Sequence, residues 1–322
     1  MSAAEPLTTV LLMAYGSPAT RDDVEAYYTH IRRGRKPSPE ELADLAGRYE
    51  RIGGASPLLE ITQQQGVRLL EQLRRDGDHF RIALGMKHAP PFIADAVAEA
   101  VAAGTQRLVA LALAPHYSRM SIGGYLEAAS DALGKLNTAV AFYPVESWCA
   151  QPLFQEVVAA HIGEALAVWP DRECDRFAVV FTAHSLPERI LTWGDPYPQQ
   201  LTESAAAVAR LAGLRQWHFA YQSAGHTGDP WLEPDVNDQV RRLAGEGHRQ
   251  FLIVPIGFVS DHLEILYDLD IELQETAAAL GVECRRTRSL NSDPVFIAAL
   301  AGVVHERLAE SPAPRIQQSA QL

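Results

Sequence analysis

Runs of Val, Leu, Ile and Ala alternate with stretches of helical periodicity along most of the chain. The apolar runs are short and bounded by turn residues, which is typical of buried strands. We predict seven strands, over Thr8–Ala14, Phe80–Met86, Leu108–Ala114, Val140–Tyr143, Phe177–Thr182, Trp217–Tyr221 and Phe251–Ile256. We predict ten helices, over Arg21–Ile31, Pro39–Arg51, Thr62–Arg74, Pro91–Ala102, Ile122–Leu136, Pro152–Val168, Leu201–Leu211, Pro234–Leu243, Leu263–Leu280 and Pro294–Leu308. Such alternation indicates parallel sheets with helices on both faces.

Two pairs of segments repeat one another in the two halves of the chain. TVLLMAYGSP at residues 9–18 and AVVFTAHSLP at residues 178–187 each join a buried strand to an alanine, a ring residue, a small residue and a proline. LALAPHYS at residues 111–118 and VPIGFVS at residues 254–260 each end a buried strand in a small-residue loop. The sequence therefore predicts two doubly wound α/β domains with parallel sheets.

We place the first domain at residues 1–150, the second at residues 151–310 and a flexible tail at residues 311–322, with the Pro152–Val168 helix as a bridge. Parallel sheets bind ligands outside the carboxyl ends of their strands, and two-domain proteins bind them between the domains. The residues at strand ends are therefore candidates for function. They are Tyr15, Lys87, His88, His116, Tyr117, His184, Gln222, Ser223 and the segment after Ile256.

The charge balance bears on the class of partner. The 322-residue chain has 28 Lys and Arg against 40 Asp and Glu, a formal net charge of −12. A chain this acidic repels nucleic-acid phosphates, so we expect no nucleic-acid partner.

The longest apolar run, Leu108–Pro115, is far too short for a membrane span, and the first residues lack the basic start of a signal peptide. We expect a cytoplasmic protein.

The cysteines bear on metal content. Cys149, Cys174 and Cys284 lie far apart and form no CxxC pair. Three thiolates are too few for a four-cysteine cluster, so we expect no [2Fe–2S] cluster. We interpret them as inert thiols in a reducing compartment.

His184 follows a buried strand and opens the turn His-Ser-Leu-Pro. A histidine in this position can be a base, a metal ligand or a hydrogen-bonded structural residue. Pro187 prevents a regular continuation of the strand, and we favour a functional role because of the position of His184 at the strand end.

An acidic row follows the last predicted strand, in the segment GFVSDHLEILYDLDIEL at residues 257–273. We expect Ser260 or Asp261 to cap a helix there, on which Glu264, Asp268 and Glu272 would recur at every fourth position. The row is either a solvated face or a surface where a cation or an exchanging proton offsets the repulsion. His184 with Glu264 would suit a divalent transition metal that is held briefly.

A basic segment stands apart from the acidic balance. No carboxylate occurs between Glu25 and Glu40, where HIRRGRK spans residues 30–36. Further arginines follow at Arg48 and Arg51, and tyrosines are interleaved. The segment is either a solvated patch or a site for a planar anion, which guanidinium groups and aromatic rings would bind.

The glycine-rich dinucleotide motif, the Walker lysine motif and Gly-x-Ser-x-Gly are absent from the sequence.

Eight motifs in one order make the chain resemble the ferrochelatase family, and most closely its monofunctional bacterial coproporphyrin branch. They are MAYGSP, YYTHIRRGRKP, RYERIGGASPL, LAPHYS, TAHSLPERI, GDPYPQQL, YQSAGHTGDPWLEPDV and VPIGFVSDHLEILYDLDIE. The resemblance implies two Rossmann-like domains with a porphyrin cleft between them. It also implies insertion of Fe²⁺, as a substrate, into coproporphyrin III to form coproheme.

The resemblance assigns roles to individual residues. His184 and Glu264 match the iron ligands and proton-handling pair, and Tyr15 matches a tyrosine on the opposite porphyrin face. The residues that match porphyrin contacts are Tyr15, Arg32, Arg48, Tyr49, Ser56 and Tyr125. Asp268 and Glu272 match an outer site for a second cation, such as Mg²⁺. The resemblance also implies a monomer and a transient contact with a coproheme decarboxylase.

Other functions stay open at this stage. A protoporphyrin IX ferrochelatase is the nearest alternative, although four propionates would better explain the strength of the basic segment. A sirohydrochlorin or cobalt chelatase would favour paired histidines. A non-catalytic tetrapyrrole carrier would not need both His184 and the acidic row, and a periplasmic-type binding protein would need a signal peptide.

Overall fold

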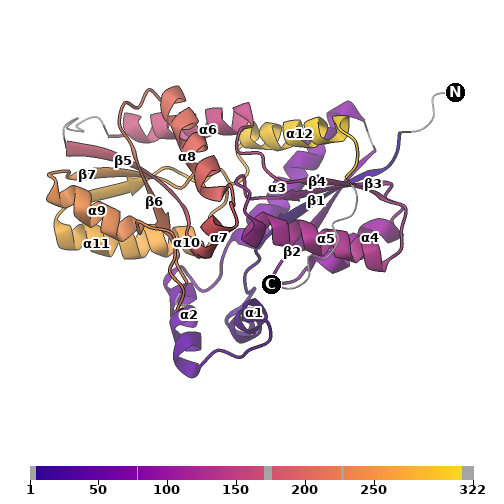
Figure 1. Cartoon of the computed structure of the whole chain (residues 1–322), viewed down its shortest axis with the longest axis horizontal. Coiled ribbons are helices and arrows are strands. Elements are labelled where there is room, and N and C mark those ends of the chain that lie inside the picture. Colours follow the sequence, from indigo (N-terminus) through magenta and orange to yellow (C-terminus); the bar gives the residue numbers. More distant parts are fainter. Residues whose placement is uncertain (1–4, 78, 170–175, 226–227, 314–322) are drawn as a thin grey trace.

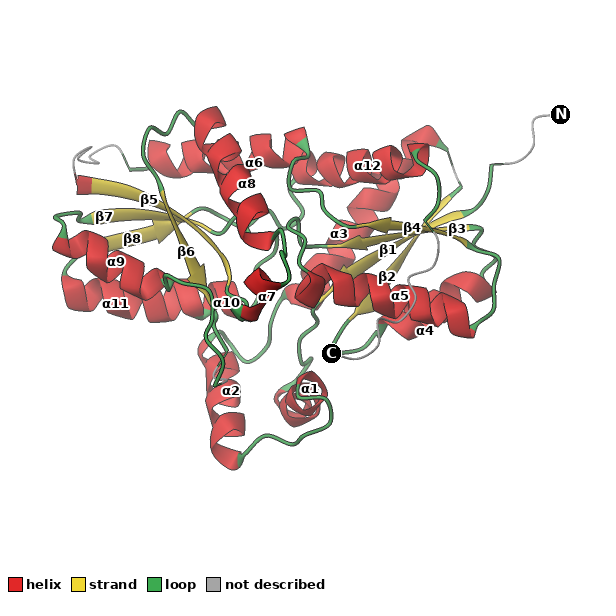
Figure 2. Cartoon of the chain, viewed as in Figure 1, coloured by secondary structure: helices red, strands yellow, loops and turns green. Residues whose placement is uncertain are grey.

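The protein forms two four-stranded sheets that lie side by side and are covered by helices (Figure 2). The computed structural model describes residues 5–77, 79–169, 176–225 and 228–313. The strand orders are β2-β1-β3-β4 and β6-β5-β7-β8, and every neighbouring pair is parallel. The predicted α/β architecture with two parallel sheets is confirmed.

Within the described residues, the strands are β1 (Thr8–Ala14), β2 (Phe80–Met86), β3 (Arg107–Ala112), β4 (Ala141–Val145), β5 (Phe177–His184), β6 (His218–Gln222), β7 (Gln250–Val254) and β8 (Glu283–Arg286). The α-helices of eight residues or more are α1 (Val24–Ile31), α2 (Pro39–Arg51), α3 (Leu58–Leu73), α4 (Ile93–Ala102), α5 (Gly124–Lys135), α6 (Pro152–Ala167), α8 (Tyr197–Leu211), α9 (Val236–Gly245), α11 (Leu273–Leu280) and α12 (Pro294–Ala309). Two single turns, α7 (Arg189–Thr192) and α10 (Leu263–Leu266), complete the set.

The two sheets have the same strand order, so β1 corresponds to β5 and β3 to β7. These are the strands of the two predicted sequence repeats, and the repeat is therefore confirmed at the level of topology. Tyr15 directly follows β1, and His184 is the last residue of β5. The two sheets thus place a tyrosine and a histidine at corresponding ends of their central strands.

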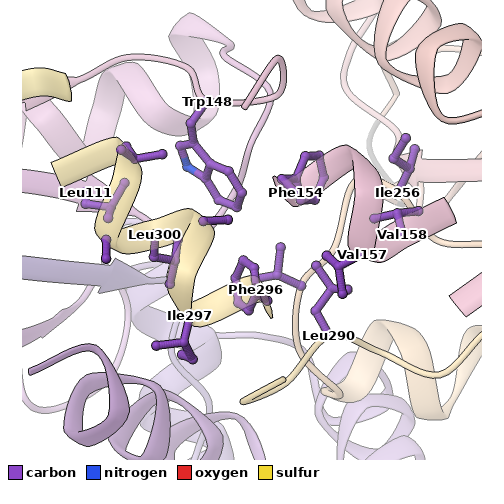
Figure 3. Packing of buried hydrophobic residues seen from close by; sticks show 14 of the residues in the cluster. Leu111, Trp148, Phe154, Val157, Val158, Ile256, Leu290, Phe296, Ile297 and Leu300 are labelled. Atoms are coloured by element: carbon purple, nitrogen blue, oxygen red, sulfur yellow. The ribbon is translucent and has the colours of Figure 1, made fainter. Parts of the chain in front are cut away.

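One apolar core runs through both halves of the molecule. Leu12 and Val109 of the first sheet belong to the same buried cluster as Phe181 of the second. Side chains of α6 and α12, including Phe154 and Phe296, join the two parts of this cluster (Figure 3). Burial of this continuous apolar surface holds the two sheets together.

The last described helix returns to the first sheet. α12 packs against α3 and β4, as well as against α6 (Figure 1). Pro294 at the start of α12 and its capping residue Asp293, whose carboxylate accepts from the amide of Val295 at 2.9 Å, fix where this helix begins. The domain boundary at residue 150 stays a prediction, and the structure adds that α12 covers the first sheet.

Two local predictions need correction. The helix predicted over Leu263–Leu280 is not continuous, because a π-helical turn at Asp268–Glu272 separates α10 from α11. Its N-cap is His262, not Ser260 or Asp261. Asp261 instead accepts hydrogen bonds from Ser289 and Asn291 at 2.6 and 2.8 Å.

Strand β8 and helix α7 were not predicted at all.

Among the described residues, no helix is both long enough and apolar enough to cross a membrane. Cys174 and residues 314–322 of the predicted tail lie outside the described residues.

Candidate active site

His184 ends the central strand β5, and its backbone and ring are both held. The Tyr197 hydroxyl donates to the His184 carbonyl oxygen at 2.9 Å, and His184 Nδ1 lies within hydrogen-bond distance of the Ser185 carbonyl oxygen. A carbonyl only accepts, so Nδ1 must carry the proton of the neutral ring. Nε2 of the neutral ring therefore keeps its lone pair, which is the state that accepts a proton or binds a metal.

Glu264 lies near the same end of the second sheet, in α10. Gln222, the β6 partner of His184 in the strand register, donates from its side-chain amide to the Glu264 carbonyl oxygen at 2.7 Å. The ring of Phe258 lies 6.4 Å from the His184 ring and 5.2 Å from the His262 ring. These contacts link the two segments that carry the predicted pair, His184 and Glu264.

His262 connects to Glu264 directly and was left unassigned by the sequence. Its Nε2 lies 3.1 Å from a Glu264 carboxylate oxygen, and its Nδ1 lies 2.8 Å from the Ser260 carbonyl oxygen. Both ring nitrogens thus face oxygen acceptors. The hydrogen bonds are complete when His262 is an imidazolium or when Glu264 carries a proton, so the pair is suited to sharing one proton.

The three predicted tyrosines, like Tyr27, lie within electrostatic reach of Glu264. Burial and the Glu264 carboxylate raise the pKa of Tyr15 and of Tyr49 above the ordinary value, and burial, Tyr15 and Glu264 do the same for Tyr125. Tyr15 is 39% exposed, whereas Tyr49 and Tyr125 are 3% and 6% exposed. Of the three predicted tyrosines, Tyr15 therefore presents the largest surface to a ligand.

A histidine pair adjoins Tyr15. The His88 ring centroid lies 4.5 Å from that of Tyr15, and His88 Nδ1 lies 3.0 Å from His30 Nδ1. Burial, then the charges of Lys87 and His30, lower the pKa of His88 to about 3, so this ring is neutral at physiological pH. Lys87 lies 5.0 Å from the Tyr125 ring centroid. Lys87 and His88 were among the predicted strand-end candidates, while His30 was not.

The predicted arginine contacts lie on an arm formed by α1 and α2, which projects from the two sheets (Figure 1). Arg32 Nη1 lies 2.5 Å from Glu41 Oε1, and Arg48 Nε lies 3.0 Å from Asp44 Oδ2. Each arginine side chain is 28% exposed. A bound anion would have to compete with these carboxylates for the two guanidinium groups.

The arm reaches the second sheet through Tyr267. The guanidinium carbons of Arg48 and Arg51 lie 5.2 and 5.3 Å from the centre of the Tyr267 ring, and Arg51 also forms an ion pair with Glu275 of α11. Ser56, the remaining predicted contact, accepts a hydrogen bond from the Leu58 amide at 3.3 Å, at the start of α3.

The acidic row is partly buried. Asp268 is 7% exposed, and the Ser223 hydroxyl donates to its carboxylate. Burial, followed by the charges of Glu264 and Glu272, raises the pKa of Asp268 to about 7. Glu272 is exposed. No group of three or more His, Cys, Asp or Glu side chains within the described residues is arranged to hold a metal ion.

Comparisons with known proteins agree with the motifs. The family model for ferrochelatase matches residues 7–308. The ferrochelatase of Herpetosiphon aurantiacus is 47% identical over 92% of this chain and 98% of that protein. The coproporphyrin III ferrochelatase of Geobacillus kaustophilus is 46% identical over 94% and 96%.

Among solved structures, SirB from Bacillus subtilis with Fe³⁺ aligns with a TM-score of 0.55 at 11% identity, over 94% of this chain and 96% of that one. At so low an identity the alignment shows a likeness of fold alone. It matches the arrangement of two parallel sheets described above.

Proposed function

The chain belongs to the ferrochelatase family, and on that basis we propose that it inserts ferrous iron into coproporphyrin III in haem biosynthesis. Fe²⁺ replaces the two N–H hydrogens of the macrocycle, and the products are coproheme and two protons. The observation that carries the proposal is His184 at the end of β5, whose Nδ1 faces a carbonyl oxygen and whose register partner Gln222 bonds to the Glu264 backbone, with Tyr15 within electrostatic reach of Glu264.

The reaction demands more than metal binding. A porphyrin is flat and its N–H hydrogens block the centre, so an enzyme must distort the ring, remove two protons and present a desolvated metal ion. In our proposal His184 Nε2 accepts a proton from the macrocycle or binds the arriving iron. Glu264 stabilises the imidazolium that forms, because an opposite charge favours the protonated ring.

We propose that protons leave through Glu264, His262 and the outer carboxylates. The pairing of His262 Nε2 with Glu264 at 3.1 Å supports the first transfer. Burial raises the pKa of Asp268 to about 7, which is the range in which a carboxyl group both accepts and releases protons at physiological pH. While no cation is bound to them, Asp268 and the exposed Glu272 would pass the protons to water.

The macrocycle would be held by Tyr15, Arg32, Arg48, Tyr49, Ser56 and Tyr125. Tyr15 would approach the porphyrin face opposite to His184. Arg32 and Arg48 would bind propionates, and coproporphyrin supplies four of these where protoporphyrin supplies two. Arg32 is already paired with the carboxylate of Glu41, and a propionate would take the place of that carboxylate on the guanidinium group.

We propose a second, hydrated cation such as Mg²⁺ at Asp268 and Glu272. The residues fit a hard cation because both supply carboxylate oxygens, which Mg²⁺ prefers, and it keeps several waters when few ligands are available. Burial and the charges of Glu264 and Glu272 raise the pKa of Asp268 to about 7, and a bound cation would favour the ionised form instead. Bound there, Mg²⁺ would offset the repulsion in the acidic row. Calorimetric titration of Mg²⁺ should show binding that Asp268→Asn abolishes.

The decisive experiment is anaerobic incubation of the protein with Fe²⁺ and coproporphyrin III. The free-base Soret and Q bands should convert to those of coproheme. Conversion of protoporphyrin IX with no conversion of coproporphyrin would establish the alternative substrate. Zinc insertion followed by fluorescence separates an enzyme from a carrier, since a carrier would bind the macrocycle without catalysing insertion.

We also propose that the protein is a cytoplasmic monomer without a [2Fe–2S] cluster, and that it passes coproheme to a decarboxylase in a transient contact. The free, buried thiols of Cys149 and Cys284 support a reducing compartment. Light scattering coupled to size-exclusion chromatography should give one chain mass of 35.3 kDa. A stable dimer would contradict this part of the proposal.

A further inference from the structure

The motif GDPYPQQL has no role in the chemistry described so far. It begins after α7 and includes the first turn of α8, and three of its side chains reach other parts of the molecule. Asp195 Oδ1 accepts from the Tyr197 amide at 3.0 Å, which is an ordinary local turn contact just before the helix. Asp195 Oδ2 accepts from the Arg119 amide at 2.8 Å and from the Ser118 hydroxyl at 3.0 Å. These two bonds lead to the loop that follows β3 of the first sheet.

Gln200, one turn along α8, binds the same side of the molecule. Its Oε1 accepts from the Tyr117 amide at 2.8 Å and from the Ser147 hydroxyl at 3.0 Å. Ser147 lies in the segment after β4, and its hydroxyl is also 3.0 Å from the Pro115 carbonyl oxygen. Helix α8 is therefore bonded to the ends of two strands of the first sheet, which the local turn contact alone does not require.

Tyr197 links the same turn to the metal-ligand candidate. It is 6% exposed, and burial raises the pKa of its hydroxyl, so the group stays a hydrogen-bond donor. That hydroxyl donates to the His184 carbonyl oxygen at 2.9 Å. The Tyr197 ring also packs in a buried cluster with Ala183 and Ile190, on either side of His184 in the sequence.

The loop bound by Asp195 and Gln200 leads to Tyr125, another predicted site residue. Ser118 caps a π-helical turn over Arg119–Gly123, which leads without a break into α5 and Tyr125. One turn of α8 thus holds the end of β5 and the loop that leads to Tyr125.

We propose that Asp195, Tyr197 and Gln200 are positioning residues. Together they form a clamp, a set of hydrogen bonds that joins the two halves of the molecule and fixes His184 relative to Tyr125 in α5. The inference rests on the proposed function for its catalytic consequence. The clamp matters because a displacement of about 1 Å between a substrate and a reacting group can cost on the order of a hundredfold in rate.

Tyr197→Phe tests the positioning of His184, because it removes one hydroxyl and keeps the ring. We expect kcat for metal insertion to fall about tenfold, with KM for coproporphyrin III unchanged within about twofold. Tyr143→Phe is the matched control, since Tyr143 is also buried but lies on the edge strand β4. Equal kcat values in both variants, or a loss confined to KM, would overturn the role of Tyr197.

Asp195→Ala and Gln200→Leu test the clamp without reference to catalysis. Hydrogen exchange should become faster at the Arg119 amide in the first variant and at the Tyr117 amide in the second, since each loses its acceptor. Thr202→Ala is the control, because the Thr202 hydroxyl bonds to the Pro198 carbonyl oxygen within α8 itself. Unchanged exchange at both loop amides would overturn the clamp, even if the variants were less stable.

The two proposals fail in different ways. Wild-type protein that binds coproporphyrin III but never metallates it contradicts the proposed function, and the exchange data then judge the clamp alone. Active wild-type protein with unchanged exchange in the Asp195 and Gln200 variants contradicts the clamp and leaves the proposed function intact.

Discussion

Gly257 lies directly against Ala183, the residue that precedes His184 in β5. A Cβ built on Gly257 would lie 2.6 Å from the Ala183 Cβ and 2.8 Å from the Ala183 Cα. The Gly257 amide also donates to the Thr182 carbonyl oxygen at 3.1 Å. Only a residue without a side chain fits this approach, so the loop after β7 and the end of β5 form one rigid unit.

Gly257→Ala should therefore disturb the site as well as the fold. We expect kcat to fall at least about tenfold, because the end of β5 must shift to relieve the contact. The melting temperature should also fall, since backbone atoms cannot move away as a flexible side chain can. Gly245→Ala in α9 is the control, because a Cβ there meets no atom within 4 Å, and it should leave both quantities nearly unchanged.

His184→Ala should abolish metal insertion while coproporphyrin III still binds, because the variant loses the proposed base and iron ligand but keeps the predicted macrocycle contacts. Rates are measured from the Soret shift, and binding from quenching of porphyrin fluorescence. Retained activity would remove His184 from the centre of the mechanism.

Glu41→Gln should strengthen coproporphyrin binding. Arg32 is paired with Glu41, and removal of that charge frees the guanidinium for a propionate. Gln at this helix position preserves the capping box with Ser38. We expect KM for coproporphyrin III to fall about threefold, consistent with the small energies of exposed ion pairs, and Arg32→Ala to raise it.

Glu50→Gln provides the matched control for this prediction. Glu50 lies on the same helix as Glu41 and forms a similar exposed pair with Arg21. Neither residue of this pair is a predicted porphyrin contact. A fall in KM that is equal in the Glu41 and Glu50 variants would indicate a general charge effect and count against a specific role of Arg32.

His116 should make the protein sensitive to acid. The ring is 2% exposed, neither of its nitrogens has a hydrogen-bond partner among the described residues, and burial lowers its pKa from 6.5 to about 3. Because the unfolded chain binds this proton near pH 6.5, the stabilising contribution is present above that pH and is lost as the pH falls towards 3. From pH 7 to pH 5 the loss is about 2 kcal/mol.

Replacement of His116 by Leu tests this dependence. Urea unfolding at pH 7 and pH 5 should show a smaller difference in free energy for the variant than for wild type. An equal difference in the two proteins would show that other groups control the acid sensitivity.

The central strands could be predicted because their residues are apolar on both faces. All seven residues of β1 are buried, as expected for a strand covered by helices on both sides of a parallel sheet. Strand β8 could not be predicted in this way, because its sequence is Glu-Cys-Arg-Arg and only Cys284 is buried. As an edge strand it pairs with β7 alone, so its pattern does not reveal it.

The positions of Tyr15, Lys87 and His184 at strand ends could be predicted from the sequence, while their roles stay predictions. The row of Glu264, Asp268 and Glu272 was placed on a regular helix because its spacing matches an α-helical face. The π-helical turn at Asp268–Glu272 breaks that face, and a spacing pattern carries no information about such a turn. The contacts of Asp195 and Gln200 were also hidden, since they depend on how two distant segments meet.

Helix α12 has a consequence for how the chain is made. The first sheet is complete in sequence by Val145, yet the helix that covers β4 begins at Pro294. During synthesis, part of the apolar surface of the first sheet therefore stays uncovered until α12 has left the ribosome. The two sheets are thus separate in sequence, but the packing of the first is completed only after the strands of the second have been synthesised.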